Sequence, residues 1–303
     1  MAITDRGYSG SNFALEIDGA FAGYIRKCDI GKMKGEVAVN NLGPLLRQKK
    51  QVTKMTWDKI TFECGVSHSG ALSTWMQETF KNNHVRKNGA VIMYDHNLNA
   101  MRRCDFTDAH LIEIGMPTFD AKGKDALYFQ LALQPETVRF TDGGGKINPT
   151  VGTKQKLHQN TNFRLNIPGV DTKHVLKCEL PKYTLKVVEH AVGEHLESQY
   201  APASVEIGDL KVTISAHEYK KMYDDALKFL AMGERSEEAE KSIILEILGP
   251  NGKDVIIDLT FENCGYKELQ MSEPLEANSE KVATTVATYY TENVVMKILQ
   301  QNL

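Results

Sequence analysis

The feature that most constrains the fold of this 303-residue chain is an internal repeat at a spacing of about 150 residues. An alternating segment at 12–17 (NFALEI), closed by Asp18-Gly19, recurs at 162–167 (NFRLNI), closed by Pro168-Gly169. Sequence identity between the two copies is low, so the repeat rests on the order and spacing of the segments. They predict that one supersecondary unit occurs twice.

The centre of each unit is predicted to be a strand followed by a helix. In the first copy Ile60 and Phe62 alternate with polar residues over 57–64, which is typical of a half-buried strand. Apolar or small residues then recur at helical spacing: Leu72, Trp75, Met76, Thr79 and Phe80. In the second copy the alternation runs over 205–214, and Ser215 is the expected N-cap. The helix that follows is predicted to have one apolar face, formed by Tyr219, Met222, Tyr223, Ala226, Leu227 and Leu230.

The other expected elements also occur in pairs. Short alternating segments at 34–39 and 183–188 are expected to run into irregular loops at 40–53 and 189–202. Two hairpins are predicted, with turns at 97–99 and at Pro250-Asn251-Gly252. Each half is expected to end in one long strand, at 125–140 and 281–298.

Many short alternating strands with one helix per half predict a mainly β (α+β) fold of two tandem domains. Each is expected to be a β-barrel or sandwich of about six or seven strands flanked by one α-helix. A glycine-rich polar stretch at 143–161 reads as a linker. The predicted domains are therefore 1–142 and 162–303.

Composition excludes several classes of protein. With 42% hydrophobic and 25% charged residues, the chain has the composition of a soluble globular protein. A net charge of −3 argues against general nucleic-acid binding. We expect no membrane span, because no apolar run approaches 18–20 residues, and we expect no signal peptide. Five cysteines without a CxxC pair predict reduced thiols in a cytosolic protein.

Motifs that would carry catalysis are weak, and we predict no enzyme, no catalytic residue, no cofactor and no metal. The histidines lack metal-ligand spacing. His190 and His195 lie among Glu189, Glu194 and Glu197. That group reads either as a weak metal site or, preferably, as a polar solvated loop.

Two tryptophans and one serine-rich segment have a functional and a structural interpretation. Trp57 and Trp75 would suit a stacking platform for a base or sugar, but each lies on an apolar stripe, which favours core packing. Residues 65–70 (GVSHSG) are one residue too long for a GxSxG nucleophile elbow, so we interpret Ser67 and Ser69 as turn and cap residues.

The first half resembles the tail tube proteins of contractile-tailed bacteriophages and of related phage-tail-like contractile injection systems. The resemblance rests on the order and character of five segments: 13–19, 57–80 with Trp75, 86–94 (RKNGAVIMY), 104–115 and 125–140. The second half matches more weakly, with Tyr219 and Tyr223 where the family would have a tryptophan.

The resemblance implies a structural protein whose domains form six-membered rings stacked into a hollow tube. Two domains per chain would let three chains supply six pseudo-equivalent places, or let six chains form two layers. The loops at 40–53 and 189–202 would reach the adjacent ring. Arg47, Lys49 and Lys50 are the candidate ring-stacking residues.

The implied partners are further copies of the chain, the sheath, and the baseplate or spike proteins, with DNA or protein as lumen cargo and no membrane. The expected location is a virion tail or injection particle assembled in the bacterial host cytoplasm. Alternatives are a tube-initiating hub, terminator or cargo adaptor of the same apparatus, or an unrelated soluble β-rich binding module.

Overall fold

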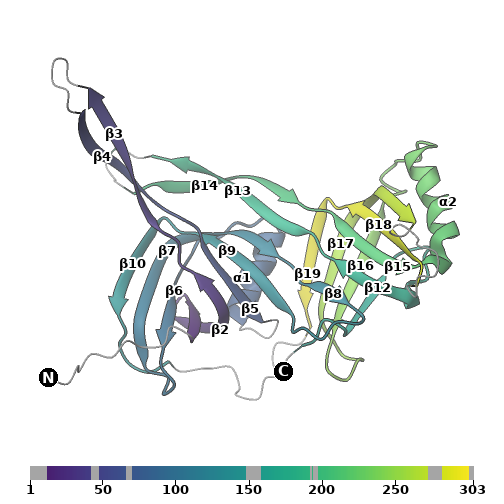
Figure 1. The fold of residues 1–303 in the computed structure, drawn as a ribbon, viewed down its shortest axis with the longest axis horizontal. Helices are drawn as coiled ribbons and strands as arrows, with labels where there is room; N and C mark the ends of the chain where they lie inside the picture. Colours follow the sequence, from purple (N-terminus) through teal and green to yellow (C-terminus); the bar gives the residue numbers. More distant parts are fainter. Residues whose placement is uncertain are drawn as a thin grey trace.

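The structure is a computed structural model that describes residues 12–41, 48–65, 70–147, 158–191, 193, 197–271 and 282–299. Two barrel-like sheets lie side by side, the first closed and the second nearly closed (Figure 1). The described residues also form two α-helices, α1 and α2, one in each half of the chain. The predicted fold class is therefore confirmed.

The strands and the α-helix of the two halves follow the same order, except that β8 has no counterpart among the described residues of the second half. The first half contains β1 (Phe13–Ile17), β2 (Ala20–Asp29), β3 (Met33–Asn41), β4 (Gln48–Trp57), β5 (Ile60–Gly65), α1 (Gly70–Phe80), β6 (Lys87–Tyr94), β7 (Ala100–Gly115), β8 (Thr118–Asp120), β9 (Tyr128–Gln134) and β10 (Thr137–Asp142). The second half contains β11 (Phe163–Asn166), η1 (Thr172–His174), β12 (Val175–Glu179), β13 (Lys182–His190), β14 (Gln199–Ile207), β15 (Leu210–Ser215), η2 (Ala216–Glu218), α2 (Tyr219–Leu230), β16 (Lys241–Leu248), β17 (Val255–Met271), β18 (Thr284–Tyr290) and β19 (Asn293–Ile298).

The first barrel closes because β7 is long enough to pair with two sets of neighbours. The strand order is β6-β1-β2-β5-β9, and β7 pairs with both β6 and β9 to complete the circle. A two-residue turn joins β1 to β2, with Asp18 and Gly19 both at positive φ (49° and 80°). This Asp-Gly pair suits the type I′ turn that tight hairpins require.

The second barrel repeats this topology, including its irregularities. Its order is β11-β16-β17-β18-β15-β12, and it stays open where β11 and β12 do not pair within their described residues. Asp108 in β7 and Asn263 in β17 both have positive φ, 50° and 52°. The register of each strand then shifts again, between Leu111 and Glu113 and between Tyr266 and Glu268. Matching bulges extend the repeat from strand order to backbone detail.

Two predictions about the strands are wrong. Each predicted closing strand, at 125–140 and 281–298, is two strands, β9 and β10 or β18 and β19. In the first half the break falls at Pro135, which has no N–H to donate to a ladder.

The predicted irregular loops at 40–53 and 189–202 are also wrong where the structure describes them. They belong to two long hairpins, β3–β4 and β13–β14. These strands are mostly exposed on both faces, so they lack the strict alternation that identifies a half-buried strand.

The helix predictions are confirmed for α1 and only partly for α2. All five predicted apolar positions of α1 are buried, and Trp75 and Trp57 belong to the core. Helix α2 begins at Tyr219 after the short η2, and the Ser215 side chain makes no capping hydrogen bond. Tyr223 and Leu230, predicted to lie on its buried face, are exposed.

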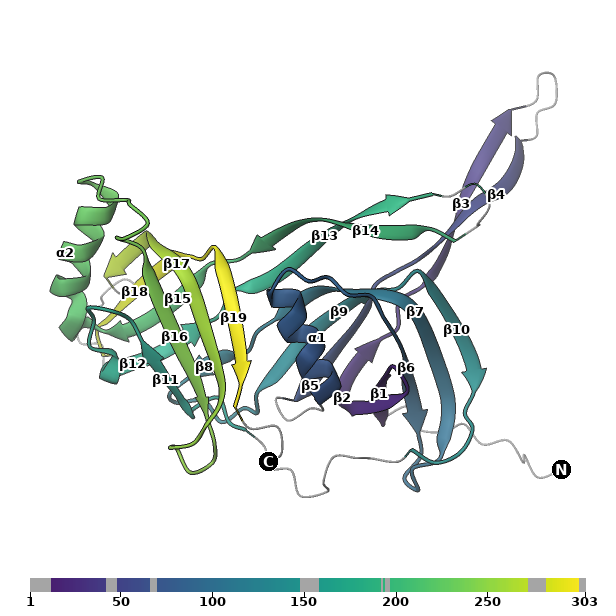
Figure 2. The same ribbon diagram turned by 180° about the vertical axis from the view of Figure 1, so that it is seen from behind.

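The two helices differ in what covers them. Helix α1 lies between the two barrels and packs against β19, whereas α2 packs on β17 at the outer side of the second barrel (Figure 2). One continuous set of buried side chains runs from the first barrel through α1 into the second. The two barrels therefore share a core.

Candidate assembly surfaces

Strands cross between the two halves of the chain in both directions. Strand β13 pairs with the end of β7, with Tyr183 opposite Ile114 and Thr184 opposite Glu113. In return β8 pairs with β12 of the second barrel. The β13–β14 hairpin thus extends the sheet of the first barrel, which is strand addition to an otherwise free edge.

Tyr183 anchors this interface through both its ring and its hydroxyl. The side chain is 1% exposed, and its ring meets Phe80 of α1 edge-on at a centroid distance of 5.3 Å. Its Oη donates a hydrogen bond to the Thr79 carbonyl oxygen at 3.0 Å, close to the end of α1. Burial raises the pKa of Tyr183 to about 12, so the hydroxyl stays a neutral donor at physiological pH.

Glu113 supplies the charge at the same edge. Its carboxylate accepts hydrogen bonds from Lys59 Nζ at 2.8 Å within the first barrel and from Lys182 Nζ at 2.7 Å on β13. Partial burial raises the pKa of Glu113, but the two ammonium groups outweigh it and the net pKa is lowered. Glu113 therefore remains ionised and links the two halves.

A second polar contact centres on Glu197, just before β14. Its carboxylate accepts hydrogen bonds from Thr137 Oγ1 at 2.6 Å, Arg139 Nη1 at 2.7 Å and Trp57 Nε1 at 3.4 Å. Burial raises the pKa of Glu197, but the hydrogen bonds, led by the one from Arg139, outweigh it and lower the net pKa. A parallel bridge between Met55 and Glu197 holds the backbone at the same place.

The predicted solvated loop around His190 is therefore wrong for two of its members. Glu197 is bound to the first barrel, and Glu189 pairs with Lys54 of β4 at 2.5 Å. His190 is exposed on β13, while Glu194 and His195 lie outside the described residues. In the described part of the chain no three His, Cys, Asp or Glu side chains gather as a metal site.

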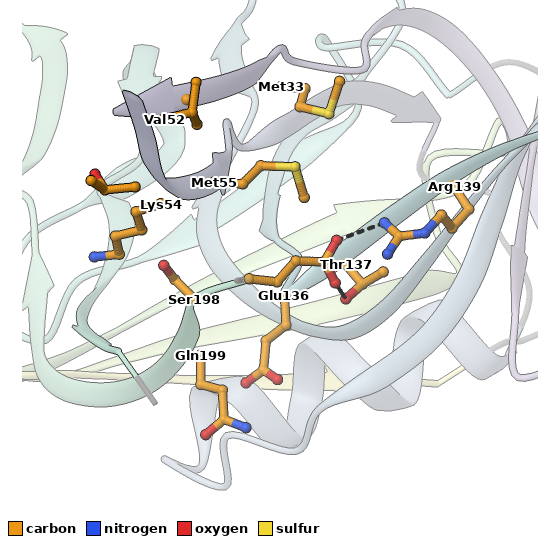
Figure 3. Close-up of a pocket in the computed structure, with 12 residues that line it drawn as sticks. Met33, Val52, Lys54, Met55, Glu136, Thr137, Arg139, Ser198 and Gln199 are labelled. Carbon is orange, nitrogen blue, oxygen red and sulfur yellow. Dashed lines mark hydrogen bonds and ion pairs between the residues drawn. The ribbon is translucent and has the colours of Figure 1, made fainter. Parts of the chain in front are cut away.

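An open pocket of about 890 Å³ lies at the base of the β3–β4 hairpin (Figure 3). Met33, Gly35 and Met55 form its apolar wall on the hairpin. Arg139 of β10 and Glu197 form part of the opposite, polar wall.

The cysteines offer no activated nucleophile. All five thiols are free, and burial raises the pKa of Cys28, Cys64 and Cys104 to about 12. A thiol that stays protonated at neutral pH is a poor nucleophile.

The structure does not gather the predicted stacking residues into a site. Lys49 and Lys50 are exposed on β4, opposite Asn40 and Val39 toward the far end of the hairpin. Arg47 lies outside the described residues. Their role in ring stacking stays a prediction.

Sequence reasoning missed the anchoring roles of Tyr183 and Glu197. The alternation of 183–188 identified the strand but not what it packs on. No local signal marks Glu197, because Thr137 and Arg139 lie 60 and 58 residues away in the sequence.

None of the described helices is long and apolar enough to span a bilayer. No curated protein matches the chain.

Several solved structures are similar in part. A chain of the sheath–tube complex of the extracellular contractile injection system PVC in its extended state is 13% identical, with a TM-score of 0.39. That match covers 46% of this chain and 89% of that one. A chain of the anti-feeding prophage (AFP) tube-terminating cap is 12% identical, with a TM-score of 0.38, covering 51% and 95%. Hcp1 from Flavobacterium johnsoniae is 18% identical, with a TM-score of 0.29, covering 45% and 99%.

The family match is specific to the first half of the chain. Residues 9–139 match the family described as T4-like virus tail tube protein gp19. The matched range includes the first barrel from β1 through β9, together with α1. Residues 9–139, less than half of the chain, are therefore similar to the T4-like virus tail tube proteins.

Proposed function

We infer that the chain is a structural component of the tube of a phage tail or contractile injection system, with each barrel occupying one place in a ring. The observation that carries this proposal is the polarity of the contact between the two halves. The second barrel adds its β13–β14 hairpin to the end of β7 in the first. Because the barrels are repeats, the same head-to-tail contact can recur between chains and close into a ring.

We assign the domains as 1–142 and 162–303, joined by 143–161. On this assignment three chains supply six pseudo-equivalent places in one ring. Such a ring would match a sixfold tube to a threefold spike, which would suit a hub, terminator or adaptor as well as a tube segment. A ring of six chains with two domain layers is the competing arrangement.

Assembly would take place in the cytoplasm of the bacterial host, and the partners would be further copies of the chain, the sheath, and baseplate or spike proteins. DNA or protein would pass through the lumen. The family match supports these partners at the level of the apparatus, since the matched family is one of tail tube proteins.

Light scattering of the purified full chain, with negative-stain images of the same fraction, tests the proposal. We expect annular particles with the mass of three chains, or stacks of them. Rings of six chains would retain the tube role and overturn the three-chain ring. A strictly monomeric protein at all concentrations would overturn self-assembly into a ring.

A further inference from the structure

The contact between the two barrels joins two different surfaces. We call one the helix surface: in the first barrel it is formed by Glu113–Gly115 of β7 and by α1. The other is the hairpin surface: in the second barrel it is formed by Tyr183, Leu185 and β19. Each barrel carries both surfaces by repetition, and the chain uses only one of each. Among the described residues, Tyr223 and Leu230 on the helix surface of the second barrel are exposed, and so is Met33 on the hairpin surface of the first.

The residue correspondences follow from the matching irregularities. Bulges and left-handed residues relate β7 to β17 with an offset of 155 residues, so Asp108 corresponds to Asn263. Register shifts after Glu36 and Lys186 relate β3 to β13 with an offset of 150. Tyr183 therefore corresponds to Met33.

Burial differs sharply between corresponding positions. Tyr183 is 1% exposed and Met33 is 62% exposed. On the helices, Phe80 of α1 is 3% exposed, whereas Leu230 at the same place in α2 is 39% exposed. The side chains that are covered at the internal contact thus have exposed apolar counterparts at the two unused surfaces.

The strands next to the helices show the same contrast. Met296 of β19, the strand against which α1 packs, is 4% exposed. Its counterpart in β10, Phe140, is 54% exposed. On β10 it is Arg139 that lines the pocket together with Met33, and its counterpart in β19 is Val295.

The strand edges needed for pairing are also free. Over Gly265–Met271, β17 pairs with β18 on one edge, and no other described strand pairs with that stretch. Strand β3 pairs only with β4 in the described part of the chain. Transferring the internal register places Met33 opposite Leu269 and Lys34 opposite Glu268.

The charged residues at the corresponding positions support this register. At the internal contact Lys182 donates to Glu113. The counterparts are Lys32 and Glu268, and both are exposed. A lysine on one chain therefore faces a glutamate on the other, as the internal contact already does.

We propose that a second copy of this chain docks its helix surface, Glu268–Gln270 of β17 with Tyr223 and Leu230 of α2, on the hairpin surface of the first barrel around Met33. This proposal rests on the inferred ring and names the residues of its chain-to-chain contact. The apolar wall of the 890 Å³ pocket, formed by Met33, Gly35 and Met55, belongs to the surface that the second copy covers.

Cysteine cross-linking tests the register directly. The variant Met33→Cys with Leu269→Cys places two thiols on directly opposed strand positions, where Cα separations of roughly 4.5–5.5 Å permit a disulfide. Under mild oxidation of the assembled full chain we expect covalent dimers and trimers on non-reducing gels, reversed by dithiothreitol. Each single variant controls for the native thiols.

A matched control moves one thiol along the same strand. Val39 is also exposed on β3, about 20 Å from Met33 at the rise of a strand. The pair Val39→Cys with Leu269→Cys should give no ladder above the single variants. Equal cross-linking by both pairs would overturn the proposed register.

Charge reversal provides a second readout that leaves the cysteines unchanged. Glu268→Lys and Lys32→Glu should each raise the protein concentration needed for assembly by about tenfold, and the double variant should recover most of it. If the wild-type chain assembles but the variant Met33→Cys with Leu269→Cys does not cross-link, this contact is wrong while the ring stands. If the wild-type chain never assembles, both proposals fall.

Discussion

At the scale of single residues, Tyr183 combines packing with one satisfied polar group. Truncation to alanine would leave a cavity beside Phe80, whereas phenylalanine would remove only the hydrogen bond to the Thr79 carbonyl oxygen.

We expect Tyr183→Ala to lower the free energy of unfolding by about 3 to 5 kcal/mol. Tyr183→Phe should lower it by about 1 kcal/mol, the usual net value of one hydrogen bond. Urea unfolding of the full chain, followed by circular dichroism, measures both. Equal losses would mean that ring packing against α1 contributes little.

Glu197 makes the stability of the contact between the two halves depend on pH. Its pKa is lowered in the folded chain, so its contribution is fully present above the pKa of an unfolded glutamate, about 4.3, and is lost as pH falls through the lowered value. At pH 7 we expect Glu197→Gln to lower the free energy of unfolding by about 1 to 2 kcal/mol.

Urea midpoints across the acid range measure this effect, and the midpoint of the variant should fall less steeply with acid. The control is Glu206→Gln, because Glu206 is exposed and forms its ion pair with Lys186 across β13–β14. Parallel pH profiles for wild type and Glu197→Gln would contradict the assignment.

At the scale of elements, the two hairpins are repeats in different surroundings. The β13–β14 hairpin lies along the first barrel, and β3–β4 projects from it (Figure 1). Exposed lysines on a projecting hairpin suit a contact with the next ring along a tube.

We expect the triple change Arg47→Glu, Lys49→Glu and Lys50→Glu to shorten stacks while leaving single rings intact, because it reverses charge at the hairpin alone. Stack length in negative-stain images, with ring mass from light scattering, gives the result. Stacks of unchanged length would remove these residues from the stacking contact.

At the scale of the whole molecule, the two barrels share one core and are expected to unfold together. Buried side chains continue from the first barrel through α1 into the second, and strands cross in both directions. A large apolar contact between domains couples their unfolding.

We therefore expect one calorimetric unfolding transition for the full chain, with the ratio of calorimetric to van't Hoff enthalpy near unity. Tyr183→Ala should broaden or split it. Two well-separated transitions in the wild-type chain would show that the barrels are energetically independent.

The sequence by itself determined the repeat, the β-rich fold class and the helix of each half. These follow from local periodicity and turn chemistry, which act over a few residues: alternation around Ile60 and Phe62, helical spacing from Leu72 to Phe80, and the Asp18-Gly19 turn. It failed where both faces of a strand are exposed, as in the first half of β4, because such a stretch has no apolar period to detect.

Only the tertiary structure decided which copy of each repeated surface is covered. Tyr183 is buried because β13 reaches the end of β7, whereas Met33 at the same place in the other copy is exposed. Leu230 lies on an apolar helical stripe like Phe80, but in the described part of the chain β13 and β19 lie against the helix of the first half, and Leu230 is exposed. Burial depends on contacts between residues far apart in the sequence, and local patterns carry no information about which of two equivalent surfaces will find a partner.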